Sequence, residues 1–514
     1  MKITKEQLRT PEATAVIAAA CYGLLTHLFA FNNILSNFDN IASQPGGYGG
    51  GVVLGRWFLE ILGLFAEKIG LDYNLSVING LIFVCLIAVS AGFLVSVLQI
   101  KSRKSAALIG MIMVAFPTVT ATMIYRYTVV YYGISLLFTI LAVWVFQRCK
   151  KGFVLSVILI TLSMGIYQAY VPMTIGLFVM LLIQQALRGE AEPLELVRRG
   201  LKECAALLLG LGLYFVCMKA MNLVTGTVVD EYQGLSSMGG ISLGQLPELV
   251  WKAFSGVFTL ALRDSYGIAN RALMRLSYLA LGLASVVMIG YILIVKIRKG
   301  IIALAVCVLC LLFPVAVNFI EIMCPNSWVY TLMVYPWVLL AFMPLMLLEC
   351  MPAAEGAREI RKQFFTKCVG LVAALLAVYY GYYANVNYTA LYYANRQIEN
   401  YLNSVVIQVR MTEGFTPEKD WAILGDVNDP LLHSAWEEDA FYDGLGFTQY
   451  LLNQYSRNDW IENYIGYDIP EASEERIAEL AESQEVRSMP CWPSEGSVKV
   501  IDDTVVVKFQ ELGS

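Results

Sequence analysis

Eleven stretches of predominantly apolar residues occupy most of this chain and constrain its fold more than any other feature. Most are close to the roughly 17–25 residues that an α-helix needs to cross the hydrocarbon core of a bilayer. Apolar residues make up 58% of the 514 residues and charged residues only 15%, whereas soluble domains carry about 25% charged residues. Because so apolar a chain cannot cover its surface with polar groups in water, the sequence predicts an all-α polytopic membrane protein with about eleven transmembrane helices. The stretches lie at about residues 13–35, 75–100, 105–123, 128–147, 152–166, 171–187, 204–223, 274–296, 300–318, 328–348 and 367–385.

The basic residues of the connecting loops predict the orientation of these helices. Loops that retain Lys and Arg stay in the cytoplasm, and here the basic clusters occupy alternate loops. This pattern puts the N-terminus in the cytoplasm of a cell with an inner or plasma membrane, and an odd number of spans puts everything after about residue 385 outside it. The clusters are Lys101/Arg103/Lys104, Arg148/Lys150/Lys151, Arg188/Arg198/Arg199/Lys202, Lys296/Arg298/Lys299 and Arg358/Arg361/Lys362/Lys367.

The composition changes along the chain and predicts two domains. Residues 1–385 form a transmembrane domain with long outer loops at 36–74 and 224–273, and the first of these ends in an amphipathic stretch typical of an interfacial helix. Residues 386–514 have a soluble pattern and form a small extracytoplasmic α/β domain. Its last part alternates apolar and polar residues over 497–509, which predicts a terminal hairpin with Asp502 and Asp503 in its turn.

The motifs of soluble enzymes are missing from the sequence. It has no Walker loop, no dinucleotide-binding glycine motif, no HExxH and no GxSxG. A basic stripe of the kind that binds nucleic acid is also missing, which excludes a nucleic-acid partner. With only two histidines and with Cys307 and Cys310 inside an apolar run, the sequence predicts neither a metal site nor a cofactor.

Polar residues gather instead at the predicted outer face. Ionisable groups at membrane depth are costly and usually face a polar cavity or a substrate path. The candidate site residues are Asp39 in the first outer loop, Arg56, Arg126 between two spans, Gln168 and Tyr170 in the turn that joins 152–166 to 171–187, Lys219 and Glu321.

Several short motifs resemble those of the GtrII-like bacterial membrane glucosyltransferases of the GT-C superfamily. They are Asn37-Phe38-Asp39-Asn40, Gly55-Arg56-Trp57 and the Tyr-Gln-Ala-Tyr turn at 167–170, in a many-span layout with an outer C-terminal domain. The resemblance implies a GT-C-like fold and an integral-membrane glycosyltransferase. It also implies a polyprenyl-phosphate hexose donor, with glucose the expected sugar, and a cell-surface glycan or cell-wall polymer as acceptor outside the cytoplasm.

The chemistry of that reaction fits the candidate residues. Asp39 is the expected general base, because an acceptor hydroxyl must lose its proton as it attacks the anomeric carbon. The leaving phosphate needs a cation, for which Arg56, Arg126 and Lys219 are candidates, and Gln168, Tyr170 and Glu321 are expected to contact substrate. A monophosphate leaving group does not require a metal, and direct attack inverts the anomeric centre.

Each residue also has a structural interpretation, and the protein has two other functional ones. Asp39 could cap a helix, Arg56, Arg126 and Lys219 could anchor in the membrane interface, Gln168 and Tyr170 could fill a turn, and Glu321 could be a solvated loop charge. The protein could instead be a non-enzymatic transporter or flippase for a lipid-linked glycan, or a scaffold whose outer domain binds cell-wall polymer.

Overall fold

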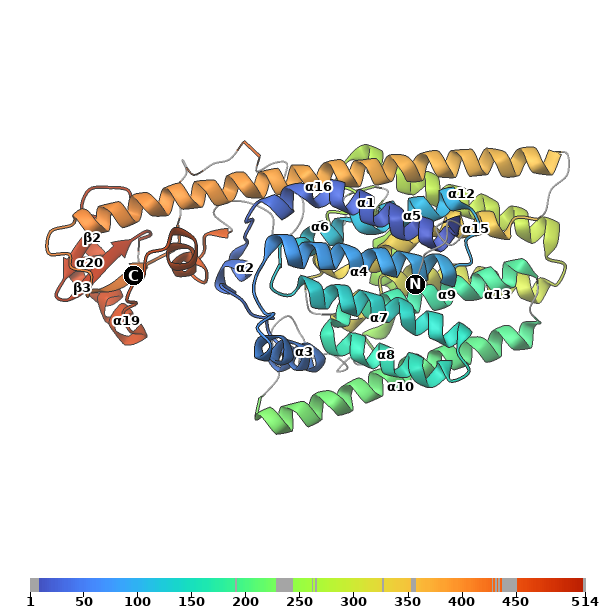
Figure 1. The fold of residues 1–514 in the computed structure, drawn as a ribbon, viewed down its shortest axis with the longest axis horizontal. Helices are drawn as coiled ribbons and strands as arrows, with labels where there is room; N and C mark the ends of the chain where they lie inside the picture. Colours follow the sequence, from blue (N-terminus) through green and yellow to red (C-terminus); the bar gives the residue numbers. More distant parts are fainter. Residues whose placement is uncertain are drawn as a thin grey trace. The chain divides into compact units, whose positions relative to one another are not determined.

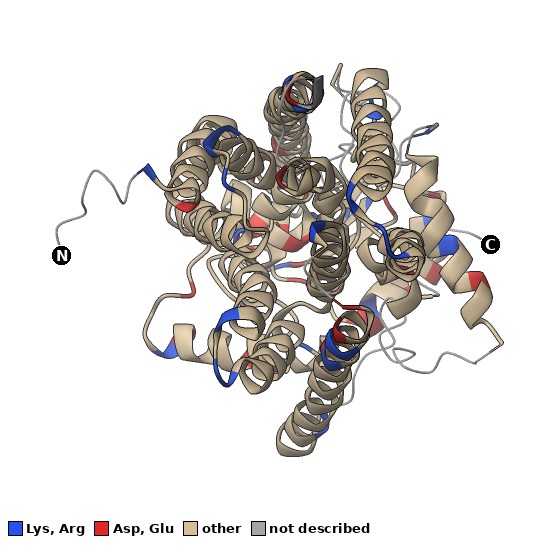
Figure 2. Cartoon of the chain, turned by 90° about the vertical axis from the view of Figure 1, so that its right-hand side faces the viewer, with Lys and Arg blue, Asp and Glu red and all other residues tan. Residues whose placement is uncertain are grey.

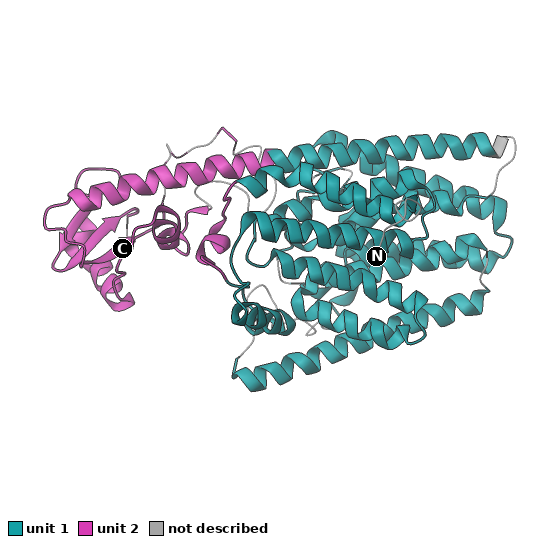
Figure 3. Ribbon diagram, viewed as in Figure 1, with its two compact units in different colours: residues 1–32, 47–385 teal, residues 33–46, 386–514 magenta. Residues whose placement is uncertain are grey.

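The computed structural model describes residues 9–189, 192–227, 244–260, 262–263, 266–325, 328–352, 357–427, 429, 432, 435–436 and 451–511. The chain divides into two compact units, coloured in Figure 3. Unit 1 comprises Met1–Asn32 and Gly47–Asn385, and unit 2 comprises Asn33–Gly46 and Val386–Ser514. The segment that carries Asp39 therefore belongs to the same compact unit as the C-terminal residues.

Unit 1 is a bundle of apolar helices. Figure 1 shows the long helices running side by side, with α3 lying across them at one end. The helices are α1 (Pro11–Asn32), α3 (Trp57–Lys68), α4 (Ser76–Val97), α5 (Arg103–Ala115), α6 (Pro117–Met123), α7 (Val129–Arg148), α8 (Gly152–Ile166), α9 (Val171–Arg188), α10 (Pro193–Thr225), α11 (Leu246–Thr259), α12 (Ala272–Lys296), α13 (Gly300–Val317), α14 (Ile320–Met323), α15 (Val338–Cys350) and the first part of α16 (Ala357–Met411). Short 3₁₀ turns lie at η2 (Val52–Leu54), η3 (Gln168–Tyr170), η5 (Thr331–Met333) and η6 (Tyr335–Trp337).

Most of these helices have the length and composition of membrane spans. In the described part of the chain, eight helices are long and apolar enough to cross a bilayer, and the bent pair α5 and α6 makes a ninth. The predicted spans at 152–166 and 328–348 correspond to shorter apolar helices, Gly152–Ile166 and Tyr335–Cys350. Fifteen residues of α8 extend only about 22 Å. The helices are consistent with a multi-pass membrane protein, and the span count of eleven stays a prediction.

The bend between α5 and α6 follows from Pro117. The two helices meet at 41° at Phe116, whose backbone is extended (ψ 140°). Proline lacks the N–H of a helical hydrogen bond and disfavours helical geometry in the residue before it, so the helix breaks there. A close approach lies nearby, because a Cβ on Gly110 of α5 would stand 2.4 Å from the Ala15 carbonyl oxygen of α1. Small residues allow such tight packing between apolar helices.

The basic loops that the sequence analysis assigned to one side of the membrane are linked to one another at one end of the bundle. Glu349 at the end of α15 accepts from the backbone N–H groups of Lys101 and Ser102, 2.9 and 3.0 Å away. Arg188 donates to Gln99, and Lys299 pairs with Glu192 at 2.6 Å. Figure 2, which views the bundle from this end, shows Lys and Arg at several of these connections.

Unit 2 contains a small three-stranded sheet. Its strands β1 (Asp420–Leu424), β2 (Val498–Ile501) and β3 (Thr504–Lys508) have the order β1-β3-β2, with β1 parallel and β2 antiparallel to β3. The predicted terminal hairpin is confirmed. The helices of this unit are α2 (Phe38–Ala42), the end of α16, α18 (Arg457–Asp459), the π-helical η8 (Trp460–Ile465), α19 (Glu474–Glu482) and α20 (Gln484–Ser488). Its core joins Ala422 and Leu424 of β1 to Leu480, Val486 and Val506.

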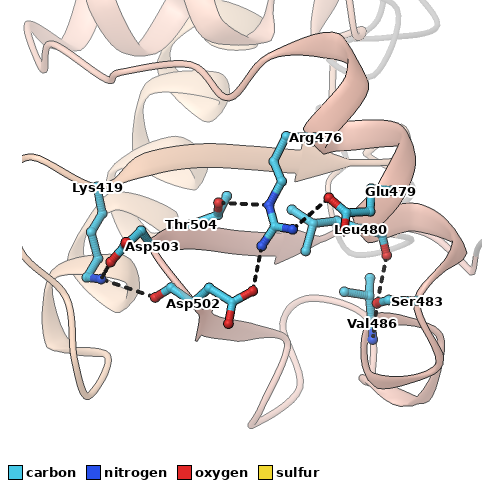
Figure 4. Close-up of polar contacts among 9 residues, drawn as sticks. All are labelled: Lys419, Arg476, Glu479, Leu480, Ser483, Val486, Asp502, Asp503 and Thr504. Carbon is cyan, nitrogen blue, oxygen red and sulfur yellow. Dashed lines mark hydrogen bonds and ion pairs between the residues drawn. The ribbon is translucent and has the colours of Figure 1, made fainter.

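Ion pairs hold the turn of that hairpin, as Figure 4 shows. Asp502 has a positive φ of 53°. Its carboxylate accepts from Arg476 Nη2 at 2.9 Å, and Lys419 Nζ lies 2.8 Å from Asp503 Oδ1. Arg476 also donates to Glu479 at 2.8 Å. Because the carboxylates of these pairs are exposed to solvent, the pairs select the turn geometry more than they stabilise the unit.

A buried lysine at the end of β3 offers a test of this unit. Lys508 is 0% exposed, and its Nζ donates to the carbonyls of Arg487 and Met489, 3.0 and 2.7 Å away, and to Glu511 at 2.8 Å. Lys508→Met should destabilise unit 2 by about 3 kcal/mol, because two buried carbonyls lose their donor. Hydrogen exchange of the β3 amides in the intact protein measures this loss of stability. Glu511→Gln, which changes only the exposed partner, should cost less than about 1 kcal/mol; equal exchange in both variants would contradict a structural role for the buried amine.

Candidate functional site

Arg56, at the start of α3, lies beside two stacked tyrosines. Its Nη1 donates to the Tyr132 hydroxyl at 3.0 Å, and the guanidinium carbon lies 5.8 and 5.2 Å from the ring centres of Tyr132 and Tyr167. The two rings stack with centroids 4.1 Å apart and an interplanar angle of 15°. Cation–π attraction and the hydrogen bond hold the guanidinium in one place, so its charge is preorganised.

The Gly-Arg-Trp motif has a local structural reason. Gly55 ends η2 with a φ of 68°, a left-handed conformation that glycine adopts without strain. A Cβ there would lie 2.8 Å from the Tyr214 hydroxyl and 3.2 Å from Gln168 Nε2. Trp57 is 7% exposed and begins the buried face of α3. Gly55 thus lets the backbone approach α10 and η3, and Trp57 anchors α3. These two neighbours in the sequence fix the backbone position of Arg56.

Gln168 and Tyr170 support this arrangement from the turn after α8. The Gln168 amide donates to the Leu54 carbonyl at 3.0 Å and to the Tyr214 hydroxyl at 3.1 Å. Tyr214 in turn donates to the Gly55 carbonyl at 3.0 Å. Tyr170 is 1% exposed and meets Tyr167 edge-on at 5.0 Å. Both predicted residues therefore lie around Arg56 and fix the loop that carries it.

Arg126, in the connection between α6 and α7, is buried against the start of α4. Only 4% of it is exposed; its Nε donates to Asn74 Oδ1 at 3.1 Å and its Nη1 to Ser76 Oγ at 2.9 Å. Its own carbonyl accepts from the Asn79 amide at 3.0 Å. These contacts tie the connection between α6 and α7 to the end of the first outer loop. The guanidinium is engaged inside the fold and does not project as an interfacial anchor.

Glu321 is a buried, paired carboxylate. It is 3% exposed, accepts from the Tyr266 hydroxyl and pairs with Lys252 Nζ at 2.7 Å. Burial raises the pKa of Tyr266, and the hydrogen bond to Glu321 raises it further. The structural interpretation as a solvated loop charge is therefore wrong. Lys252 comes from α11 and Glu321 from α14, so the pair fastens these two helices to each other.

Cys324 is a buried free cysteine at the end of α14. Burial raises the pKa of the Cys324 thiol to about 11, and Glu321 raises it further, so this cysteine is a thiol at neutral pH.

Lys219 is exposed on α10, and no residue in the described part of the chain forms an ion pair or hydrogen bond with its side chain. It follows Tyr214 on the same helix but contributes nothing to the contacts around Arg56. The structure therefore does not bring Lys219 together with the other predicted cations.

Asp39 lies in unit 2, at the second position of α2. The cap of this helix is Asn37, whose Oδ1 accepts from the Asn40 amide at 2.8 Å, so the interpretation of Asp39 as the cap is wrong. Asn395 fixes the preceding segment by hydrogen bonds of 2.8 Å to both the N–H and the carbonyl of Ser36. Asn463 of η8 donates to the Ile41 carbonyl at 3.1 Å. The aspartate is half-buried in a loop held on both sides.

Asp39 and a second carboxylate of the same unit, Asp459, both act on Tyr455. Burial raises the pKa of Tyr455, and both Asp39 and Asp459 raise it further. The pKa of Asp459 is itself raised by burial and by Glu471. Sequence reasoning missed Asp459, and also Tyr132 and Tyr214 of unit 1. No motif marks them, although a tyrosine inside an apolar span signals a hydroxyl that needs a partner. Within the described ranges, no group of three or more His, Cys, Asp or Glu side chains is arranged to hold a metal ion.

These features define a class of protein: a multi-helix membrane protein with an arginine held beside two stacked tyrosines and a buried carboxylate, Glu321, paired with Lys252. A family model described as Glucosyl transferase GtrII matches residues 28–341, more than half of the chain. The chain therefore belongs to the GtrII glucosyltransferase family, and the resemblance noted in the sequence is confirmed. All seven predicted site residues lie inside the matched range. No curated protein and no solved structure matches the chain.

Proposed function

We propose that this protein transfers glucose from a polyprenyl-phosphate donor to a cell-surface glycan outside the cytoplasm. Family membership indicates a glucosyltransferase, which requires a sugar donor and an acceptor. The observation that carries the choice of donor is the arginine of the Gly-Arg-Trp motif, held by Tyr132 and Tyr167. A preorganised guanidinium is well suited to a phosphate monoester, because it offers paired N–H donors and a permanent charge.

The exposed face of α3 supports a lipid-linked substrate. Trp57 and Leu59 are buried, whereas Ile61, Leu64 and Phe65 are 42%, 49% and 61% exposed. A helix with one apolar face on the protein and another exposed suits the boundary between headgroups and acyl chains. Arg56, at the start of this helix, would then meet the donor phosphate at headgroup depth.

In the proposed reaction, Asp39 takes the proton of the acceptor hydroxyl as its oxygen attacks the anomeric carbon. The bond from that carbon to the phosphate oxygen breaks, and polyprenyl phosphate leaves with the electron pair. Arg56 stabilises the charge on the leaving phosphate. A single displacement inverts the anomeric centre, and this GT-C-type mechanism needs no metal.

The other predicted residues receive distinct proposed roles. Glu321 and Tyr266 contact substrate hydroxyls, because a buried carboxylate can accept hydrogen bonds from those hydroxyls. Gln168, Tyr170 and Arg126 position the outer loop for substrate, as their hydrogen bonds and ring contacts are to that loop and its neighbours. Lys219, exposed on α10, meets the lipid headgroups beside the donor.

The experiment for the proposed function is transfer by the purified protein in liposomes with a panel of polyprenyl-phosphate sugars and a glycan acceptor. Transfer of glucose from the polyprenyl-phosphate donor is expected, with inversion of the anomeric configuration in the product. Transfer from a nucleotide sugar in the absence of any lipid donor would contradict the proposal.

The proposed topology makes a separate prediction. With the N-terminus in the cytoplasm of an inner or plasma membrane, a reporter fused after Ser514 should score extracytoplasmic and one inserted at 355–362 cytoplasmic. Alkaline phosphatase and fluorescent-protein fusions measure the two sides. The same side for both fusions would mean that the chain does not cross the membrane between them, which would contradict the eleven-span topology.

A further inference from the structure

A groove on unit 1 combines apolar walls with two cations. It has a volume of about 660 Å³ and is lined by Phe153 of α8 and by Leu194, Val197, Arg198, Leu201, Lys202 and Ala205 of α10. The apolar residues of α10 recur at intervals of three and four, so they form one face of the helix. Arg198 and Lys202 are four residues apart and lie one above the other beside that face.

The walls of the groove are exposed to whatever surrounds the bundle. Leu194 and Leu201 are 77% and 66% exposed, and Phe153 is 37% exposed. They belong to helices that have the composition of a membrane protein, so acyl chains are the natural contact for these side chains. An apolar groove at the end of a span is open to a lipid tail.

The two cations of the groove are not neutralised by the described residues. The neighbouring Arg199 pairs with Glu203 at 2.9 Å, but neither Arg198 nor Lys202 forms an ion pair in the described part of the chain. Lys151, at the N-cap of α8, lies two residues before the lining residue Phe153 and adds a third positive charge. A ligand whose charge complements these two cations is therefore an anion.

We propose that this groove binds an anionic phospholipid, with the phosphate between Arg198 and Lys202 and an acyl chain along the leucines of α10. The volume is in the range of sites for small ligands, roughly 300–1,000 Å³. The predicted topology puts these residues at the cytoplasmic leaflet, where anionic lipids attract basic residues next to a span. The inference does not depend on the transfer reaction.

The groove is separate from the Arg56 cluster. Arg198 precedes Tyr214 by 16 residues on one continuous helix, a separation of about 24 Å along its axis. A lipid here would contact the first turns of α8 and α10, which pack against each other. It would therefore hold the cytoplasmic ends of these two helices together without touching the proposed donor site.

Native mass spectrometry of the purified protein, titrated with phosphatidylglycerol, tests the proposal. Arg198→Ala with Lys202→Ala should weaken binding about 25-fold, since each basic residue near a membrane surface contributes about fivefold. Lys101→Ala with Lys104→Ala is the matched control, with the same change of charge at another exposed basic loop, and should bind like the unchanged protein. Equal binding by both double variants would overturn the proposal.

Two further arms distinguish a lipid from a free anion. Ala205→Trp fills the groove and leaves both cations, and it should weaken binding of phosphatidylglycerol. Glycerol phosphate should compete poorly with the lipid, because it lacks the acyl chains. Competition by glycerol phosphate as strong as by the lipid, or unchanged lipid binding by Ala205→Trp, would show a simple anion site and contradict the proposed one. Phosphatidylcholine should bind more weakly than phosphatidylglycerol.

Discussion

Asp39→Asn is expected to lower the rate of glucose transfer by about 10²–10⁴, the usual cost of losing a general base. The substitution keeps the size of the side chain and removes the ability to accept a proton. It leaves the cap of α2 intact, because the capping oxygen belongs to Asn37. The fold of unit 2 should therefore be unchanged, and the loss should appear in the rate constant for transfer while donor binding is retained. Single-turnover transfer with bound donor measures this directly.

The control for this prediction is Asp468→Asn, which removes one negative charge from an exposed position in the same unit. It should transfer glucose at the normal rate. Near-normal transfer by Asp39→Asn would move the base elsewhere, and the structure ranks the other candidates. Glu60 accepts from the Tyr48 hydroxyl at 2.9 Å and from the Val52 amide at 3.3 Å, so it is engaged in holding the first outer loop. Glu321→Gln would then be the variant to measure next.

Arg56→Ala should weaken donor binding about ten- to hundredfold, since a charge-assisted hydrogen bond contributes roughly 1.5–3 kcal/mol. The side chain reaches from α3 to the rings of Tyr132 and Tyr167, so the alanine variant also loses the hydrogen bond to the Tyr132 hydroxyl and the cation–π contacts. Arg56→Lys should recover part of the loss if the phosphate is held by a point charge and little if it is held by two parallel N–H bonds. Binding of a fluorescent polyprenyl phosphate to the purified protein measures the affinity.

Lys68→Ala is the matched control for Arg56, because it removes one exposed positive charge from the last turn of the same helix. It should bind the donor normally. Donor affinity that is unchanged in Arg56→Ala, or reduced equally in the two variants, would show that the phosphate is bound elsewhere. Tyr167→Phe separates the stacking from the charge: it keeps the ring over the guanidinium and should preserve most of the affinity.

The arrangement around Arg56 also explains why the motif is short. Gly55 accommodates the hydroxyl of Tyr214, Arg56 packs beside the Tyr132–Tyr167 stack and Trp57 anchors α3. Each of the three residues meets a different partner helix or turn, so few neighbours in the sequence are constrained. The partners Tyr132 and Tyr214 lie in apolar spans, where a single tyrosine changes the hydropathy pattern too little to be noticed.

Sequence alone determined the helices, the terminal hairpin and the family-like motifs of this protein. The signals for the helices and for the hairpin are local. A span needs about 20 apolar residues in a row, and a hairpin needs two alternating runs around a turn, so each can be identified without knowing the rest of the chain. The two short helices, Gly152–Ile166 and Tyr335–Cys350, show the limit: their position was clear from hydropathy, but whether each crosses a membrane depends on how the neighbouring helices pack.

Only the tertiary structure decided which polar residues meet. The Arg56–Tyr132 hydrogen bond joins residues 76 apart in the sequence, and the Tyr214–Gly55 bond joins residues 159 apart. The pairing of Glu321 with Lys252 was likewise invisible, because a lone glutamate after a span has the same local pattern whether it is solvated or buried. The same is true of the segment Asn33–Gly46, whose membership of one compact unit with residues 386–514 is a long-range association that local patterns do not record. Local sequence records the solvent that each segment prefers, whereas the partner of a buried charge is set by how distant helices pack around it.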